Sequence, residues 1–240
     1  MTPTVFDALR ARVAGVRTVR RIGRVAGSGA GTLLVTGLSR IAALGDRVMV
    51  GGAGAEVIGL TAEALTVLPD APAEGVVIGA EVVHLGAGTL SPDLGWIGRV
   101  IDPDGRPLDG RPLLPGPVPR PLRSEPPPAA RRRKLGERLS TGLAVFDTLL
   151  PLVRGQRIGL FAGSGVGKSS LLGSLARGVA ADIVVLALVG ERGRELRHFV
   201  EDVLGAEGMR RSVVIAATSD QSALVRRRCV PAAMAVAEYF

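Results

Sequence analysis

The stretch that decides the fold runs from Leu160 to Ser170 and reads L-F-A-G-S-G-V-G-K-S-S. It joins a short apolar segment to a glycine-rich turn and then to a run whose apolar residues recur at helical spacing. Such a turn directs several backbone N–H groups at one point, and the positive end of the helix dipole suits that point to a phosphate chain. We therefore predict a strand at Arg157–Ala162, a phosphate-binding turn, and a helix at Gly167–Gly178.

The turn supplies a set of candidate nucleotide-contacting residues. In this pattern the lysine reaches the β- and γ-phosphates of ATP, and the hydroxyl that follows it is a ligand of Mg²⁺. The usual motif, G-x-x-x-x-G-K-[ST], has a glycine where this chain has alanine, a minor departure because alanine is unsuited only to positive φ. The alternative is a flexible glycine-rich surface loop, which the flanking strand and helix patterns disfavour. The candidates are Ala162, Gly163, Ser164, Gly165, Val166, Gly167, Lys168, Ser169 and Ser170, with Ser169 as the metal ligand.

Composition limits the remaining possibilities. The 240 residues carry a net charge of +8, and 47% of them are hydrophobic but only 3% aromatic, which predicts an aliphatic core. The excess of arginine permits a nucleic-acid or acidic membrane partner, although a compositional bias explains it more simply. The single cysteine, Cys229, excludes an internal disulfide and is expected to be buried. No apolar run is long enough to span a membrane and no secretory signal is recognisable, which predicts a cytoplasmic location.

The pattern along the chain predicts three parts. Residues 1–17 read as an amphipathic helix, residues 18–90 as a small β-barrel domain, and residues 91–240 as a parallel-sheet nucleotide-binding domain that includes a solvated basic run at Arg131–Lys134. Short strands rich in Val, Ile and Thr are expected in the barrel. They are Val19–Ala26, Gly31–Thr36, Arg47–Val50, Ala55–Leu60, Ala64–Leu68 and Val76–His84. In the third part we expect further strands at Ile183–Val189 and Ser212–Ala217, and helices at Arg194–Leu204 and Gln221–Glu238.

A second chemical element follows the next strand, at Glu191 and Arg192. The carboxyl ends of parallel strands share one edge of a sheet, so Glu191 and the phosphate loop are expected at the same edge. A carboxylate there can orient the water that attacks the γ-phosphate, and Arg192 can steady the phosphate charge. The alternative role for Glu191 is to complement a helix dipole. We take Lys168, Glu191 and Arg192 as the candidate catalytic residues.

Five stretches carry a family resemblance. They are G-R-V-I-D-P-D-G-R-P-L-D-G at 98–110, R-R-R-K-L-G-E-R-L-S-T-G at 131–142, R-G-Q-R-I-G-L-F-A-G-S-G-V-G-K-S at 154–169, L-V-G-E-R-G-R-E at 188–195 and A-T-S-D-Q-S-A-L-V-R-R-R-C at 217–229. They resemble the flagellum-specific ATPases of bacterial type III export, which are similar to injectisome ATPases and to the β subunit of rotary ATP synthases. The resemblance implies a small N-terminal β-barrel followed by a RecA-like P-loop domain, which is incomplete here.

The same resemblance implies function and partners. It implies ATP hydrolysis with Mg²⁺, coupled to export of flagellar proteins by a homohexameric ring at the inner face of the cytoplasmic membrane. The implied partners are a stator-like regulator bound through the N-terminal helix, export-gate membrane proteins, export substrates and their chaperones.

The sequence also lacks parts of the family pattern. The family's second Mg²⁺-site carboxylate and its C-terminal helical domain do not appear within these 240 residues, so we expect this chain to hydrolyse ATP weakly or not at all. Whether it is a fragment or a truncated product stays open. The alternatives are an injectisome ATPase, a rotary synthase subunit, a catalytically inactive assembly or binding module, and a nucleic-acid translocase.

Overall fold

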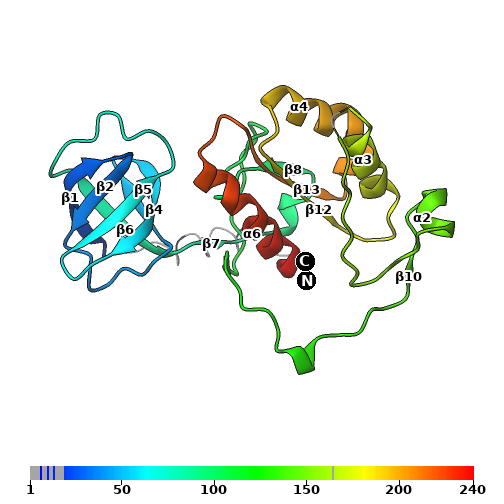
Figure 1. Ribbon diagram of the computed structural model, residues 1–240, viewed down its shortest axis with the longest axis horizontal. Coiled ribbons are helices and arrows are strands. Elements are labelled where there is room, and N and C mark those ends of the chain that lie inside the picture. Colours follow the sequence, from blue (N-terminus) through cyan, green and yellow to red (C-terminus); the bar gives the residue numbers. More distant parts are fainter. Residues whose placement is uncertain (1–5, 7–9, 11–12, 14–18, 164) are drawn as a thin grey trace.

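The structure is a computed structural model that describes residues 6, 10, 13, 19–163 and 165–240. The predicted helix at residues 1–17 therefore lies almost entirely outside the described residues, as does Ser164 of the phosphate loop. Figure 1 shows a barrel beside a sheet with helices on both of its faces. No helix among the described residues combines the length and the apolar character needed to cross a membrane.

The first part is a closed barrel, as predicted. Its strands are β1 (Arg21–Gly29), β2 (Thr32–Thr36), β3 (Asp46–Val50), β4 (Ala53–Leu60), β5 (Ala64–Pro69) and β6 (Glu81–Ala87), joined in the order β1-β2-β5-β4-β3-β6. All neighbouring pairs are antiparallel. Alternate residues point inward, so Leu33, Val35, Leu65 and Val67 are 0–2% exposed. The predicted strand at Val76–His84 begins later, at Glu81, because residues 76–80 form a turn at 78–79 and no strand.

The second part is built on a parallel sheet in the order β12 (Val184–Val189), β13 (Ser212–Ala217), β8 (Arg99–Ile101). Alternate residues of β13 face opposite layers. Val213 and Ile215 pack against α6 (Ala223–Tyr239), whereas Val214 and Ala216 pack against the layer that holds α3 (Lys168–Gly178). These contacts confirm the predicted parallel sheet covered on both faces, and Figure 1 shows α6 on one side and α3 on the other.

The strand predicted at Arg157–Ala162 is wrong. This segment has no strand partner and no backbone hydrogen bond of its own in the described part of the chain, and Phe161 is 97% exposed. A β-strand needs a neighbour that supplies N–H and C=O groups, and β12 has a described neighbour only in β13. The third strand of the sheet is β8, a short element that precedes the phosphate loop by more than fifty residues.

The helical layer beside α3 is continuous but changes its winding. Instead of a single helix at Arg194–Leu204, the chain forms α4 (Gly193–His198), a π-helical turn η3 (Phe199–Leu204) and α5 (Gly205–Met209). The apolar stripe of this region still faces the sheet, because Phe199 and Leu204 are buried. The predicted helix therefore exists, but a π-turn, which sequence periodicity does not reveal, occupies its second half.

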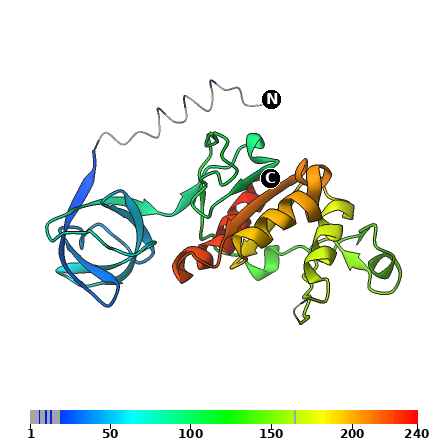
Figure 2. The ribbon, with the colours of Figure 1, turned by 90° about the horizontal axis from the view of Figure 1, so that it is seen from above.

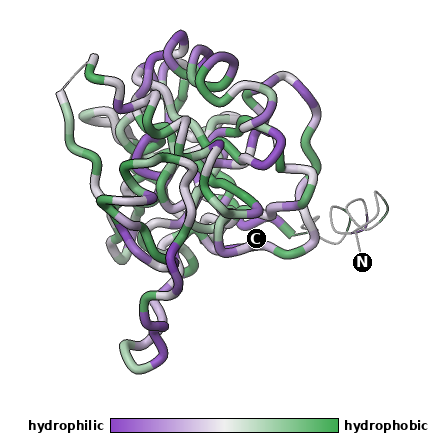
Figure 3. The backbone as a smooth tube through the Cα atoms, turned by 90° about the vertical axis from the view of Figure 1, so that its right-hand side faces the viewer, coloured by the Kyte–Doolittle hydropathy of each residue, from purple (hydrophilic) through white to green (hydrophobic). Residues whose placement is uncertain are grey.

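A long connecting segment links the barrel to the phosphate loop. It holds β7 (Thr89–Leu90), η1 (Leu94–Trp96), β9 (Arg120–Pro121), η2 (Ala129–Arg131), β10 (Arg138–Leu139), α2 (Ala144–Thr148) and β11 (Leu152–Val153). Within it β7 pairs with β9, and β10 with β11. The basic run 131–134 is exposed, and in Figure 3 the segment around η2 projects from the lower end of the molecule. This exposure matches the interpretation of the run as solvated.

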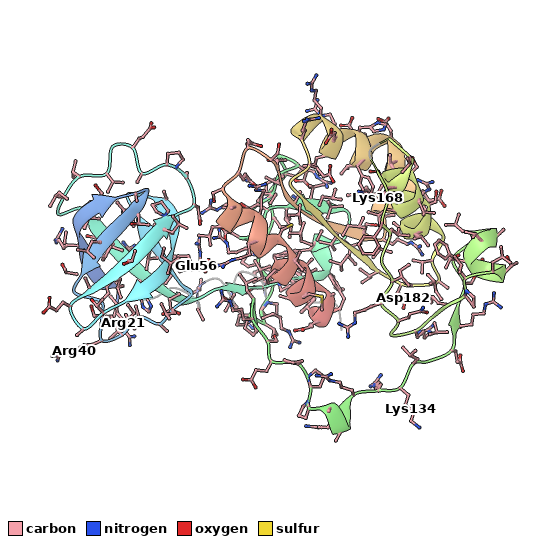
Figure 4. The ribbon with its side chains drawn as sticks, viewed as in Figure 1. Arg21, Arg40, Glu56, Lys134, Lys168 and Asp182 are labelled. Atoms are coloured by element: carbon pink, nitrogen blue, oxygen red, sulfur yellow. The ribbon has the colours of Figure 1, made fainter. Side chains whose placement is uncertain are left out.

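Charged side chains join the barrel to α6. The buried Arg228 guanidinium donates hydrogen bonds to Asp70 at 2.8 Å and to Asp104 at 3.4 Å, while Arg227 contacts Glu56 at 2.7 Å. Figure 4 shows Glu56 on the side of the barrel that faces α6, and Figure 2 shows from above that α6 begins beside the barrel. Burial alone would raise the pKa of the Asp70 carboxyl, but hydrogen bonds from Arg47 and Arg228 outweigh it and lower that pKa.

Cys229 is buried, as the sequence predicts. It is fully buried on α6, with its Sγ 3.3 Å from the carbonyl oxygen of Ile215. Burial raises the pKa of the thiol to about 11, because the thiolate would lose its hydration. The neighbouring arginines therefore do not activate it.

Candidate nucleotide-binding site

The glycine loop has the backbone that the sequence predicts for phosphate binding. Gly165 and Gly167 have φ values of +77° and +87°, and Gly167 is the residue directly before α3. These left-handed conformations are natural only for glycine. Ala30 alone among the described non-glycine residues has a positive φ, so Ala162 sits in an ordinary conformation. Alanine in place of the motif's first glycine therefore causes no backbone strain here.

The loop is open to an approaching ligand. A Cβ atom placed on Gly163, Gly165 or Gly167 would meet no other atom within 4 Å. Residues 161–163 and 165–170 are all exposed, so the first N–H groups of α3 face solvent. With Lys168 at the same helix start, these groups fit the polyphosphate of a nucleotide, because they combine backbone donors, a positive helix end and a compact cation.

The orientation of α3 follows from contacts at its other end. Arg211, directly before β13, lies at 2.8–2.9 Å from carbonyl oxygens in the last turn of α3, and its own carbonyl accepts from the N–H of Val184 at the start of β12. The carboxyl end of α3 therefore lies at the amino-terminal edge of the sheet. Eleven helical residues rise about 16 Å, comparable to the length of β12. The amino end, with Lys168 and Ser169, lies at the other end of this helix, whose main contacts are with η3 and α5.

Glu191 lies at the carboxyl-terminal edge of the sheet, directly beyond β12. Its carbonyl accepts a hydrogen bond from the Ser219 N–H at 3.0 Å, and the Gly190 N–H donates to Ala217 at 2.6 Å. These bonds tie the loop after β12 to the loop after β13. The Glu191 side chain itself is exposed. The structure therefore places Glu191 at the predicted edge, but no hydrogen bond or ion pair joins its side chain to that of Lys168 within the described residues.

Arg192 has a structural partner of its own. It precedes α4, and its guanidinium lies 3.2 Å from the carboxylate of Glu195. The backbone N–H of Arg192 donates to the same carboxylate, and this hydrogen bond is the main reason why the pKa of Glu195 is lowered. Glu195, rather than Glu191, therefore forms the capping box of α4. Glu195 therefore complements the dipole of α4, and the same role for Glu191 stays an alternative.

The loop after β13 adds groups that sequence reasoning did not single out. The Thr218 hydroxyl donates to the carboxylate of Asp220, which lowers the pKa of Asp220. A cleft of about 580 Å³ borders this loop on the barrel side and is lined by acidic residues of both parts, including Asp70, Asp104 and Asp220. The only sequence signal was the stretch A-T-S-D-Q at 217–221, which carried resemblance without an assigned role.

Together, the barrel, the parallel sheet and the glycine loop at the start of α3 define a P-loop nucleotide-binding protein. Residues 142–240 match the nucleotide-binding domain of the ATP synthase alpha/beta family. The flagellum-specific ATP synthase of Caulobacter vibrioides is 46% identical over 85% of this chain and 47% of its own length. The type 3 secretion system ATPase of Xanthomonas euvesicatoria is 37% identical over 100% of this chain and 55% of its own length.

Solved structures agree with these relatives. The assembled ATPase EscN, in complex with its central stalk EscO from the enteropathogenic E. coli type III secretion system, superposes with a TM-score of 0.83 at 35% identity. The match covers 91% of this chain and 54% of EscN. These findings confirm the resemblance: the chain is related to the flagellum-specific and type III secretion ATPases, and over residues 142–240 to the ATP synthase alpha/beta family. It spans about half the length of the curated relatives it matches.

Proposed function

We propose that the chain carries the nucleotide-binding part of an ATP-hydrolysing motor that energises type III export of flagellar proteins. The observation that carries the proposal is the open glycine loop at the start of α3, with Lys168 in the first turn of that helix. Relatives named as flagellum-specific ATP synthases support the flagellar assignment. An injectisome ATPase is the second candidate, because a type 3 secretion system ATPase of Sinorhizobium fredii is 44% identical over 78% of the chain.

The proposed chemistry assigns one task to each residue. Backbone N–H groups of residues 162–170 hold the phosphate chain, and the Lys168 ammonium pairs with the β- and γ-phosphates. The Ser169 hydroxyl would be a ligand of Mg²⁺, which neutralises phosphate charge when bound. Glu191 orients a water molecule whose oxygen attacks the γ-phosphorus and accepts a proton from it. The bond from that phosphorus to the bridging oxygen breaks, leaving ADP and inorganic phosphate, and Arg192 steadies the charge.

Assembly and location belong to the same proposal. The loop lies on an open surface, so we propose that the site is completed between subunits of a homohexameric ring; the similar EscN, an assembled ATPase in complex with a central stalk, supports this. The domain division 1–17, 18–90 and 91–240 fits this scheme, with the first segment contacting a stator-like regulator. Export-gate proteins, export substrates and their chaperones are the remaining proposed partners, at the cytoplasmic face of the membrane.

The first test separates binding from hydrolysis in the 240-residue chain. Equilibrium dialysis with a non-hydrolysable ATP analogue and Mg²⁺ should show saturable binding that Lys168→Ala abolishes and Lys134→Ala leaves unchanged. Phosphate release by the same chain should be near background, because residues 157–163 pair with no strand in the described part of the chain. Failure of the wild-type chain to bind the analogue, or equal binding by both lysine variants, would overturn the proposed function.

A further inference from the structure

The Arg211 side chain contacts the last backbone carbonyl groups of α3, the helix that follows the phosphate loop. Its Nη2 lies 2.8 Å from the carbonyl oxygen of Ala176, 2.9 Å from that of Arg177 and 2.8 Å from that of Val179. Its Nη1 lies 2.9 Å from the carbonyl oxygen of Ala181, in the loop that leads to β12. One half-buried guanidinium therefore contacts four backbone carbonyls, three of them at the end of α3.

This arrangement suits the chemistry of both partners. The last carbonyls of a helix have no partner within the helix, and they carry the negative end of its dipole. A guanidinium offers five N–H donors in a planar fork and is always charged, so it can satisfy several of these oxygens at once. A lysine ammonium offers three donors around one atom and is poorly shaped to span the same set.

The opposite end of α3 has no comparable support among the described residues. The segment before it, residues 157–163, pairs with no strand in that part of the chain. Along its length α3 rests on η3, where a Cβ at Gly173 would lie 2.3 Å from Val203 and where the Arg177 guanidinium donates to the Val203 carbonyl. These contacts hold the middle and the carboxyl end of α3, and the amino end projects from them.

We propose that Arg211 is a positioning residue for the nucleotide site. It fixes the carboxyl end of α3 against the amino-terminal edge of β12 and β13, and the rigid helix transmits this position to the loop N–H groups and to Lys168. This inference rests on the proposed function, because it assumes that the loop binds a nucleotide. Arg211 touches no phosphate; it acts on binding only through the helix.

The test measures binding of the non-hydrolysable ATP analogue with Mg²⁺ to Arg211→Ala, with Arg210→Ala as the matched control. Arg210 is the neighbouring residue and is exposed, and its replacement by alanine changes the net charge by the same amount as Arg211→Ala. We expect the Kd of Arg211→Ala to rise about tenfold, which corresponds to about 1.4 kcal/mol, and that of Arg210→Ala to stay at the wild-type value. Low millimolar guanidinium should restore binding to Arg211→Ala, whereas sodium chloride at equal concentration should not.

Guanidinium rescue separates positioning from a general loss of stability. If Arg211→Ala unfolds more easily but binds the analogue with the wild-type Kd, or if guanidinium fails to restore its binding, the inference is overturned. Should Arg211→Ala not fold, Arg211→Lys replaces it, with an expected Kd between those of the wild type and the tenfold increase; a wild-type Kd in that folded variant also overturns the inference. Absence of binding in the wild-type chain would instead reject the proposed function.

Discussion

The strands of the barrel and those of the nucleotide-binding part differ in whether neighbouring strands are available to their backbone N–H and C=O groups on both sides. Every strand of the barrel has two neighbours, because the order β1-β2-β5-β4-β3-β6 closes on itself. The sheet of the second part has an open order, β12-β13-β8, and the segment before the phosphate loop pairs with nothing in the described chain. Among the described residues, the two most exposed large apolar side chains, Phe161 at 97% and Leu149 at 78%, belong to the second part, whereas Leu65 in the barrel is fully buried.

The difference indicates where the stability of the chain resides. A closed barrel leaves no free edge, so its core forms without help from another chain. The nucleotide-binding part instead presents exposed apolar residues and a phosphate loop held mainly through the carboxyl end of α3. We expect the barrel to tolerate little change in its interior, and the exposed apolar side chains of the open part, such as Leu149, to tolerate truncation.

The largest expected effect is at the joint between the two parts. Arg228→Met removes one of the two arginines that hold the partly buried Asp70 and Asp104, and it takes from Glu56 its buried arginine partner, so the free energy of unfolding should fall by about 3–5 kcal/mol. Arg227→Met is the matched control, because Arg227 has a side chain that is 60% exposed and its buried partner Glu56 keeps Arg123 and Arg228 nearby; it should cost about 1–2 kcal/mol. Urea denaturation of both variants measures the difference. Equal losses of unfolding free energy in the two variants would show that the burial of Arg228 does not determine how much this residue stabilises the fold.

A pair of leucine truncations compares the two parts directly. Leu65→Ala in the barrel core should lower the free energy of unfolding by about 3 kcal/mol, because it removes buried methyl groups and leaves a cavity. Leu149→Ala in the open part should change it by less than about 0.5 kcal/mol. For both variants, the change in the free energy of unfolding follows from the shift of the denaturation midpoint, provided that the dependence on denaturant concentration is unchanged. A loss at Leu149 as large as the loss at Leu65 would mean that the open part buries this residue in solution.

A smaller effect is expected at the ion pair between Arg99 of β8 and Asp109. The hydrogen bond from Arg99 holds the pKa of the Asp109 carboxyl far below its usual range. A lowered pKa stabilises the fold above the unfolded-state value near 4, and this contribution is lost as pH falls below it. Asp109→Asn should therefore cost about 1–2 kcal/mol at neutral pH.

The same variant gives a pH test of that pair. Because asparagine does not titrate, the free energy of unfolding of Asp109→Asn should fall less steeply below about pH 4 than that of the wild type. Denaturation curves at several acidic pH values measure both slopes. Parallel slopes for the two proteins would exclude Asp109 as a source of acid sensitivity.

Sequence reasoning located most elements that depend on local pattern. The barrel strands and β13 were found because alternating or continuous Val, Ile and Leu residues reflect which faces are buried. The loop glycines were singled out by the spacing of the phosphate-loop motif, and the structure gives Gly165 and Gly167 the positive φ that suits this residue type. The position of Lys168 at the first turn of α3 followed from the same motif.

The rest depends on contacts between distant residues. Arg157–Ala162 has the composition of a strand, but composition does not supply a partner, and the segment stays unpaired within the described residues. β8 is too short to show which sheet it joins. Arg211 looks like any surface arginine in the sequence, and only the fold brings it to the carbonyls of Ala176 and Val179. The capping role of Glu195 was likewise hidden until Arg192 was placed before α4.

The most direct test of the central claim uses the chain's two lysines, Lys134 and Lys168. Figure 4 shows them on different segments, Lys134 on the exposed connection and Lys168 at the start of α3. An acyl phosphate of ATP transfers its acyl group to a lysine amine that contacts the end of the triphosphate, and peptide mass spectrometry identifies the modified lysine. The account predicts acylation of Lys168 that excess ATP with Mg²⁺ suppresses, and background acylation of Lys134 that ATP does not change. Equal acylation of both lysines, with no protection of either by ATP, would contradict it.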